Sequence, residues 1–254
     1  MMKKFENKIA LITGGSGGIG ATAAKMLVNE GAKVMLVDIN EDALKETIND
    51  IGKDKSAYIV ADVSDEQQTK KYVDETIKKF GTIDVFFNNA GVEGKVIPLD
   101  EYPLDEFNKV IDINVKGAYY GLRHVFPHMK KNGGSIVITS SVAGLAGTPN
   151  VLPYVTSKHA VIGMMKSAAL EGAPHKIRVN TINPSPVDNR MMRSLEEGFA
   201  PGEAENAKTN FEQSIPLGRY ATNEEVAKLM LFLAGDDSEF ITGTVNPIDG
   251  GMTA

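Results

Sequence analysis

The sequence predicts an α/β fold in which helices cover both faces of a doubly wound parallel sheet. Two observations lead to this prediction. Short apolar runs alternate with longer stretches of helical periodicity along the whole chain, and the apolar runs are almost unbroken by polar residues. Unbroken runs are typical of parallel strands, because helices bury both of their faces. Regular alternation of strand and helix favours right-handed crossovers, so we expect a three-layer α/β/α architecture with about seven strands.

The expected elements follow one another from the N-terminus. A strand is predicted where a short run is rich in β-branched and other apolar residues, and a helix where apolar residues recur at intervals of three and four. Strands are expected at residues 9–13, 33–37, 57–60, 85–87, 135–139, 178–182 and 244–248. Helices are expected at residues 19–30, 41–51, 66–80, 104–131, 154–172 and 223–234.

We expect residues 1–254 to form a single domain, because no repeat, low-complexity tract or linker divides the chain. Two segments break the alternation of strands and helices. Residues 92–103 read as a loop after the fourth strand, and residues 188–214 mix charges, Gly and Pro with apolar side chains. A long irregular insertion in a compact α/β domain is usually functional, so segment 188–214 is predicted to be a substrate lid.

Composition excludes several classes of protein. The chain has 33 Asp and Glu against 27 Lys and Arg, a net charge of -6, which argues against a nucleic-acid or anionic-membrane binder. No apolar stretch is long enough for a transmembrane helix or a signal peptide, so a cytoplasmic location is expected. The absence of cysteine excludes disulfides and Cys-ligated zinc. No metal site is expected, because none of the histidines (His124, His128, His159 and His175) has metal-ligand spacing to carboxylates.

A cluster of glycines follows the first predicted strand. Residues 9–20 read IALITGGSGGIG, and a helical pattern begins at Ile19. Glycines at such a turn let backbone N–H groups approach a pyrophosphate, and the helix dipole adds positive potential. The alternative is a glycine-rich turn without a ligand. The P-loop of nucleotide triphosphatases is excluded, because no Gly-Lys-Ser/Thr follows. The candidate phosphate-binding residues are Gly14, Ser16, Gly18, Ile19 and Gly20.

Asp38 ends the second predicted strand, about 20 residues after the glycine cluster. A carboxylate in this place accepts hydrogen bonds from the adenosine ribose hydroxyls and repels a 2′-phosphate. No neighbouring basic residue compensates for that charge, since Ile39 follows directly. The cofactor is therefore predicted to be NAD and not NADP. The alternative is that Asp38 caps the helix at 41–51, a role that Asn40 could also fill.

Tyr154 and Lys158 stand four residues apart at the start of a predicted helix, with Pro153 at a plausible first position. Residues with this spacing share a helix face. A free phenol has a pKa of about 10, and a nearby ammonium group stabilises the phenolate. Such a tyrosine can exchange a proton with an alcohol or carbonyl oxygen while hydride moves to or from a nicotinamide. The spacing alone is short enough to occur by chance.

Taken together, the motifs resemble those of the short-chain dehydrogenase/reductase family, in its compact branch of about 250 residues. The resemblance spans essentially the whole chain and implies a Rossmann-type fold and an NAD(H)-dependent oxidoreductase that acts on alcohols and ketones. The motifs are Thr13-Gly14-x-x-x-Gly18-Ile19-Gly20, Asp62-Val63, Asn88-Asn89-Ala90-Gly91, Asn114, Ser140-Ser141, Tyr154-x-x-x-Lys158 and Asp249-Gly250-Gly251.

The resemblance implies a role for each residue of the catalytic group. Tyr154 is the general acid/base, and Lys158 lowers the pKa of Tyr154 while hydrogen-bonding the nicotinamide ribose. Ser141 orients and polarises the substrate oxygen, with Ser140 as the neighbouring alternative. Asn114 would interrupt its helix and hold a water molecule that links Lys158 to solvent. Judged without the resemblance, Asn114 reads as a polar residue that is satisfied within its helix.

The resemblance also implies cofactor contacts and shows one departure from the family pattern. Asp62 and Val63 correspond to the adenine contacts, and Asn89 to a backbone clamp on the adenosine ribose. After the sixth strand the family usually has Pro-Gly followed by Thr, whereas this chain reads PSPVDN at residues 184–189. The backbone of Val187 can still bind the nicotinamide carboxamide, and Asn189 places an amide where the family has a hydroxyl.

The substrate is predicted to be a neutral secondary alcohol or ketone. Residues 142–153, the loop from residue 92 onward and the lid at 188–214 should supply its contacts, and their lining is mainly apolar with little positive charge. A 3-oxoacyl-[acyl carrier protein] reductase is the alternative within the family, although Asp38 disfavours the NADPH that such enzymes usually take. A polyol, sugar or hydroxysteroid dehydrogenase comes next. A non-catalytic dinucleotide sensor is the alternative from another class.

Assembly is also implied by the resemblance. Members of the family are mostly tetramers that pair through the helices expected here at 104–131 and 154–172 and through their C-terminal segments. Residues 240–254 are apolar and glycine-rich, as a buried segment would be. We therefore expect a homotetramer.

Overall fold

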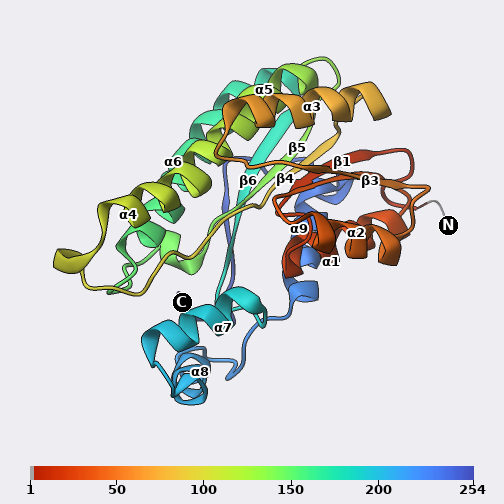
Figure 1. Cartoon of the computed structure of the whole chain (residues 1–254). Helices are drawn as coiled ribbons and strands as arrows, with labels where there is room; N and C mark the ends of the chain where they lie inside the picture. Colours follow the sequence, from red (N-terminus) through yellow and green to blue (C-terminus); the bar gives the residue numbers. More distant parts are fainter. Residues whose placement is uncertain (1–2) are drawn as a thin grey trace.

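The computed structural model describes residues 3–254 and contains a seven-stranded, fully parallel sheet with the strand order β3-β2-β1-β4-β5-β6-β7. Helices cover both faces of this sheet (Figure 1). The predicted Rossmann-type fold is confirmed. The strands are β1 Ile9–Thr13, β2 Lys33–Asp38, β3 Ser56–Val60, β4 Val85–Asn88, β5 Gly134–Thr139, β6 Ile177–Pro184 and β7 Val245–Ile248.

Two hydrophobic cores lie on opposite faces of the sheet. Side chains of a strand alternate between the two faces, so Ala10 and Ile12 of β1 enter one core and Leu11 enters the other. Helices α1, α2 and α9 pack on the first face, and α3, α5 and α6 on the second (Figure 1). The helices are α1 Gly18–Asn29, α2 Glu41–Ile51, α3 Glu66–Phe80, α4 Leu104–Ile111, α5 Gly117–Met129, α6 Leu152–Gly172, α7 Arg190–Phe199, α8 Ala204–Gln213 and α9 Asn223–Ala234.

The strand order reverses between β1 and β4, which lie side by side although two strands separate them in sequence. Ligands of open α/β sheets bind at such a switch point, beyond the carboxyl ends of the strands. The register pairs Thr13 with Val37 and Ile12 with Phe87, so the ends of β1, β2 and β4 lie together. The predicted glycine loop, Asp38 and Asn89 all follow from these strand ends.

One expected helix is interrupted at Asn114, as the resemblance implied, and one segment expected to be irregular is helical. The helix predicted at 104–131 is divided by a π-helical segment, Asp112–Lys116, that separates α4 from α5. The segment 188–214 is not irregular but forms α7 and α8, which lie outside the layers that cover the sheet (Figure 1). These two helices pack on each other, with the rings of Phe199 and Phe211 edge to face at 5.5 Å. Their glycines and Pro201 fall between the helices or at their ends and hide the short periodic pattern.

The remaining predicted boundaries agree with the structure to within two residues. Helix α6 begins at Leu152, two residues before the predicted start, so Pro153 lies in the first turn, where its missing N–H has no helical partner to lose. Among the helices of residues 3–254, none combines the length and the apolar character that a membrane span requires.

Candidate active site

The glycine loop between β1 and α1 is tightly folded against the end of β4. Gly14 has φ +63°, and a Cβ there would lie 2.9 Å from Nδ2 of Asn89. A Cβ on Gly20 would overlap the carbonyl oxygen of Gly14. A Cβ on Gly17 would meet only the carbonyl oxygen of Gly14, at 3.4 Å, and Gly17 caps α1 without a side-chain hydrogen bond. The loop therefore presents the uncapped N–H groups of α1, beginning at Gly18, as a cradle that suits a pyrophosphate.

Asp38 braces the glycine loop at the end of β2. Its Oδ2 accepts a hydrogen bond from the N–H of Ser16 at 3.2 Å, and its Oδ1 accepts from the N–H of Ile39 at 2.8 Å. Asn40 is the residue that caps α2, since its side chain accepts from the N–H of Ala43 at 3.1 Å. The alternative in which Asp38 is that cap is therefore wrong. The carboxylate lies beside the phosphate cradle, where a ribose would meet it.

The ends of β1, β4 and β5 are tied together by threonines and Asn89. Nδ2 of Asn89 donates to the carbonyl of Thr13 at 3.1 Å, and Thr139 donates to Oδ1 of Asn89 at 3.0 Å. The hydroxyl of Thr13 accepts from the N–H groups of Asn89 and Ala90 at 3.0 and 3.1 Å. Sequence reasoning gave no role to Thr139, whose only signal is its position at a strand end.

Asp62 and Val63 follow β3 and lead into α3. The carboxylate of Asp62 accepts from the N–H and the hydroxyl of Ser64 at 2.9 and 2.7 Å, which folds the turn. Val63 packs against the start of α5, where a Cβ on Gly117 would lie 2.9 Å from its Cγ2. The turn thus borders the same edge of the sheet as Asp38.

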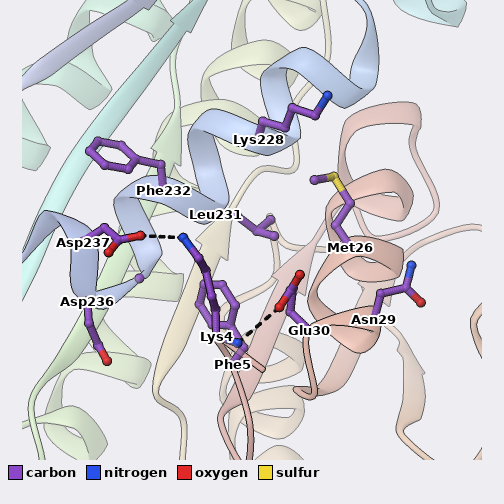
Figure 2. Close-up of a pocket in the computed structure, with 11 residues that line it drawn as sticks. Lys4, Phe5, Met26, Asn29, Glu30, Lys228, Leu231, Phe232, Asp236 and Asp237 are labelled. Carbon is purple, nitrogen blue, oxygen red and sulfur yellow. Dashed lines mark hydrogen bonds and ion pairs between the residues drawn. The ribbon is translucent and has the colours of Figure 1, made fainter. Parts of the chain in front are cut away.

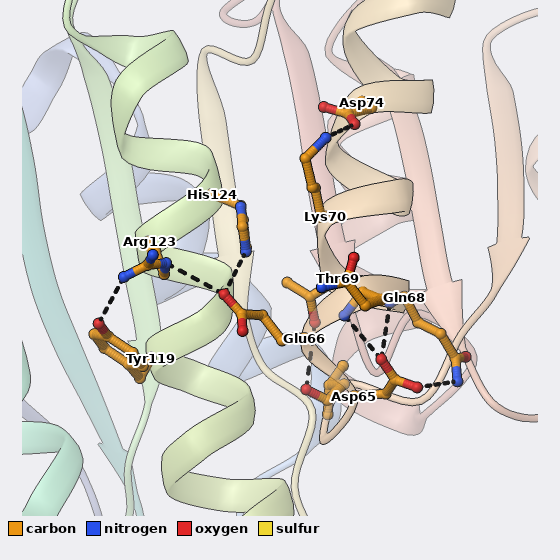
Figure 3. Close-up of polar contacts among 11 residues, drawn as sticks. Asp65, Glu66, Gln68, Thr69, Lys70, Asp74, Tyr119, Arg123 and His124 are labelled. Atoms are coloured by element: carbon orange, nitrogen blue, oxygen red, sulfur yellow. Dashed lines mark hydrogen bonds and ion pairs between the residues drawn. The ribbon is translucent and has the colours of Figure 1, made fainter.

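Helix α3 is fastened to α5 just after this turn (Figure 3). Asp65 caps α3 by accepting from the N–H of Gln67 at 2.8 Å, and Glu66 pairs with Nε of Arg123 at 3.3 Å. The buried Nε2 of His124 also lies 3.4 Å from Glu66. These contacts hold the middle of α5, the helix that follows the π-helical segment.

The predicted catalytic residues lie together on α6 and at the end of β5. Nζ of Lys158 lies 5.4 Å from the ring centroid of Tyr154 and donates to the carbonyl of Thr139 at 2.9 Å. Ser141 lies close enough to Tyr154 to act on the pKa of the phenol, and its hydroxyl accepts from the N–H of Ala143 at 3.1 Å and donates to the carbonyl of Pro184 at 3.5 Å. Ser140 instead donates to the carbonyl of Lys158 at 2.8 Å. The geometry therefore favours Ser141 over Ser140 as the partner of the phenol.

Burial shifts the pKa values of both residues on α6. It raises the pKa of Tyr154 to about 12, while the hydroxyl of Ser141 acts in the opposite direction and the charge of Glu93 adds to the rise. Burial lowers the pKa of Lys158 to about 8. The resemblance implied that Lys158 lowers the pKa of Tyr154, but the groups of the chain itself raise it. At neutral pH the phenol is thus protonated, and the pKa of Lys158, about 8, lies only slightly above neutral pH.

Asn114 lies in the π-helical segment and clamps the loop that follows β4. Its Oδ1 accepts from the N–H of Val92 at 2.8 Å, and its Nδ2 donates to the carbonyl of Val92 at 2.8 Å and to the hydroxyl of Ser157 at 3.0 Å. A Cβ on Gly91 would lie 3.2 Å from Oδ1 of Asn114 and 3.4 Å from Nζ of Lys158. The interruption of the helix is confirmed, and the side chain is fully hydrogen-bonded within the chain.

The departure from the family pattern at 184–189 leads into α7. Asn189 caps α7 by accepting from the N–H groups of Met191 and Met192 at 3.0 and 3.4 Å. Val187 forms a parallel β-bridge with Ala221. The neighbours of Val187 make its hydrogen bonds: the N–H of Asp188 donates to the carbonyl of Ala221, and the carbonyl of Pro186 accepts from the N–H of Ala221. The N–H and carbonyl of Val187 are therefore left out of this bridge. The N–H and carbonyl of Val187 thus lie next to the start of α7, which begins at Arg190.

Asn223, which sequence reasoning missed, joins the start of α7 to the glycine loop. Its Oδ1 accepts from Nδ2 of Asn189 at 3.4 Å, and a Cβ on Gly18 would lie 2.7 Å from the same oxygen. Asn223 begins α9, and nothing in the periodic pattern of that helix marks its first residue as part of a site.

A separate cavity of about 540 Å³ lies between the start of the chain, α1 and α9 (Figure 2). An ion pair of 2.6 Å between Lys4 and Asp237 crosses it. Its lining includes Phe5, Met26 and Phe232, and none of the predicted site residues. Within residues 3–254, no group of three or more His, Asp or Glu side chains could hold a metal ion.

Burial of Lys158 is expected to make the stability of the protein depend on pH. The pKa of this ammonium group is about 8 in the folded chain against an ordinary value of 10.5. Between these values the unfolded chain binds more protons, so the free energy of unfolding rises with pH. Relative to a Lys158→Met variant, the wild type should gain about 2 kcal/mol between pH 7 and 9.5. Denaturant unfolding at the two pH values measures this gain, and a constant difference would contradict it.

Comparisons with known proteins agree with this geometry. A family model described as Enoyl-(Acyl carrier protein) reductase matches residues 14–253. Levodione reductase from Leifsonia aquatica is 39% identical over 99% of this chain and 96% of its own length. A crystal structure of levodione reductase covers 97% of this chain and 98% of its own, with a TM-score of 0.94 and 39% identity.

Two further proteins extend the comparison. The crystal structure of NAD+-bound xylitol dehydrogenase is 36% identical, with a TM-score of 0.93 over 98% of this chain and 100% of its own. The 3-oxoacyl-[acyl-carrier-protein] reductase FabG of Thermotoga maritima is 37% identical over 98% of this chain and 99% of its own length. Because these matches run almost from end to end and the predicted motifs meet at one edge of the sheet, the chain belongs to the short-chain dehydrogenase/reductase family.

Proposed function

We propose that the protein is an NAD(H)-dependent oxidoreductase that interconverts a secondary alcohol and a ketone. The observation that carries this proposal is the meeting of Ser141, Tyr154 and Lys158 beside the loop held by Asn114, at the sheet edge that also bears the glycine loop. An oxidoreductase is supported by the family and by the dehydrogenases and reductases among its relatives.

NAD fits the residues that line the cofactor side of this edge. The uncapped start of α1 suits the pyrophosphate, and Asp38 suits the adenosine ribose. We assign Asp62 and Val63 to the adenine, Asn89 to the adenosine ribose, and Val187 with Asn189 to the nicotinamide carboxamide. Bound NAD would accept hydride from the alcohol, and NADH would return it to the ketone. The NAD+-bound state of the xylitol dehydrogenase relative supports this choice of cofactor.

The catalytic side chains have distinct tasks in this proposal. The protonated phenol of Tyr154 donates its proton to the carbonyl oxygen of a ketone, and Ser141 orients that oxygen through its hydroxyl. Lys158, with a pKa of about 8, can take up or release a proton near neutral pH and so restore the phenol. Asn114 positions this group by fixing the loop at Val92 against Ser157.

The substrate is proposed to be a neutral alcohol or ketone. The loop after β5 contributes Leu145, and helix α7 contributes apolar side chains such as Met191 and Leu195 among its charged residues. The name of the levodione reductase relative supports a small ketone. A 3-oxoacyl-[acyl carrier protein] reductase is the second candidate, favoured by the FabG relative and by the name of the family model. Asp38 disfavours the NADPH that this reaction usually takes.

A panel of alcohols and ketones, assayed in parallel with NAD(H) and NADP(H), tests the proposal. Oxidation of neutral secondary alcohols with NAD, or reduction of neutral ketones with NADH, is the expected result. Activity confined to 3-oxoacyl thioesters with NADPH would establish the second candidate. Absence of turnover with every substrate would favour the dinucleotide sensor.

Two further features of the chain remain proposals. We propose that residues 1–254 act as one NAD-binding domain in which segment 188–214, comprising α7 and α8, is the substrate lid. A homotetramer is also proposed, and exposed apolar side chains support it, among them Leu170 on α6 and Phe240 near the C-terminus. Light scattering measures this directly, and a monomer would refute it.

A further inference from the structure

The loop that follows β4 carries a buried carboxylate that the catalytic residues do not use. Glu93 is only 8% exposed. No hydrogen-bond donor among residues 3–254 reaches its side chain, and its one ion-pair partner is Nη1 of Arg190 at 3.9 Å. Arg190 is the first residue of α7, and its side chain is 82% exposed. The carboxylate oxygens still reach solvent although the residue is buried, so they can accept a hydrogen bond from a ligand.

The backbone on both sides of Glu93 is held in place. Asn114 binds the N–H and carbonyl of Val92 on one side. On the other side, the hydroxyl of Tyr102 accepts from the N–H of Lys95 and donates to its carbonyl, both at 3.0 Å. Between them Gly94 has φ +73°, which only glycine adopts readily. The carboxylate is thus positioned before any ligand binds.

The carboxylate lies between the catalytic helix and the lid. Its charge contributes to the raised pKa of Tyr154, so it is close enough to act on the phenol. Arg190 connects it to the start of α7. Helix α7 also packs on the same loop, since a Cβ on Gly198 would lie 2.7 Å from Cγ2 of Val96. A substrate bound between Tyr154 and α7 would therefore meet Glu93.

The chemistry of this position selects among polar substrate groups. A carboxylate only accepts hydrogen bonds, so the group that binds it must carry an O–H or N–H. A carboxylate or phosphate on the substrate would be repelled. An ammonium group would compete with the guanidinium of Arg190, which already compensates part of the charge at 3.9 Å. A neutral hydroxyl meets neither obstacle.

We propose that Glu93 is a substrate-binding residue that accepts a hydrogen bond from a second hydroxyl group, so that the preferred substrates are diols and the corresponding hydroxyketones. This inference rests on the proposed function, because it places a second polar group of the substrate on the side of the site away from the reacting C–O bond. The apolar side chains of α7 would cover the carbon skeleton between the two oxygens.

Steady-state oxidation with NAD tests the proposal on two variants of the full-length protein. Cyclohexanol is compared with 1,2- and 1,4-cyclohexanediol. The wild type should show the higher kcat/KM for at least one of the diols. Glu93→Gln, which keeps the shape but not the charge, should lower that value about 10-fold, and Glu93→Leu about 100-fold, mainly through KM. Oxidation of cyclohexanol by both variants should be retained, which also reports that they are folded.

Glu101→Gln is the matched control, because Glu101 is exposed on the same loop and forms no ion pair within residues 3–254. It should leave the ratio of diol to cyclohexanol unchanged. Equal losses for diol and cyclohexanol in both Glu93 variants would overturn the inference, since they would indicate a purely structural role. A wild-type preference for 2-aminocyclohexanol over the diol would also overturn it. If the wild type oxidises neither cyclohexanol nor the diols, the proposed function itself fails.

Discussion

Replacement of Tyr154 with phenylalanine is expected to lower kcat by about 10³-fold. The variant keeps the ring on α6 but loses the phenolic O–H whose pKa Ser141 influences. Affinity for NAD(H) should be retained, because the glycine loop and Asp38 are untouched. Single-turnover kinetics measure the loss, and the fluorescence of NADH measures binding independently of turnover.

Tyr119→Phe provides the control for this substitution. Tyr119 is exposed on α5, and its hydroxyl accepts a hydrogen bond from Nη1 of Arg123 at 3.3 Å, away from the catalytic residues, so turnover should be unchanged. If Tyr154→Phe retained most of its kcat, another group would have to exchange the proton. If the variant lost turnover but kept its full biological effect, a dinucleotide sensor would be the better description of the protein.

Replacement of Asp38 with asparagine is expected to lower the preference for NAD over NADP by about 10²- to 10³-fold. Asparagine retains an oxygen that can accept from the N–H of Ser16, so the loop should keep its shape. The negative charge that opposes a 2′-phosphate is removed, and the hydrogen bonds to the ribose weaken because the acceptor becomes neutral. The ratio of kcat/KM for the two cofactors is the quantity to measure.

Asp42→Asn is the matched control, because Asp42 lies on α2 just after Asp38 with a side chain that is 94% exposed. It should leave the cofactor ratio as in the wild type. An unchanged ratio in Asp38→Asn would mean that Asp38 only braces the glycine loop. A wild type that uses both cofactors equally would overturn the assignment of NAD.

Much of the fold could be predicted because local patterns determine it. The unbroken apolar run at Ile9–Thr13 and the glycines that follow it leave few options other than a buried parallel strand that enters a helix. Helices α2 and α3 are capped by Asn40 and Asp65, residues that favour helix starts in any context, and both were predicted at their observed bounds.

The parts that sequence did not predict depend on tertiary contacts. Helix α7 has apolar residues at helical spacing, Met192, Leu195 and Phe199, but glycines and Pro201 interrupt the segment, and its packing on α8 through Phe199 and Phe211 is a tertiary contact. The clamp between Asn114 and Val92 joins residues that are 22 positions apart. The raised pKa of Tyr154 depends on burial, which no spacing of Tyr and Lys reveals. Glu93 was noted as part of a substrate loop, but its isolation from donors is visible only in three dimensions.

Two parts of the site rest on different hydrophobic cores, one on each face of the sheet. Helix α1, which begins at the phosphate cradle, packs through Leu27 in one core. Helix α6, which carries Tyr154 and Lys158, packs through Met165 in the other. We therefore expect that substitutions in one core change dinucleotide affinity and that substitutions in the other change the rate of proton transfer, because the sheet separates the two cores.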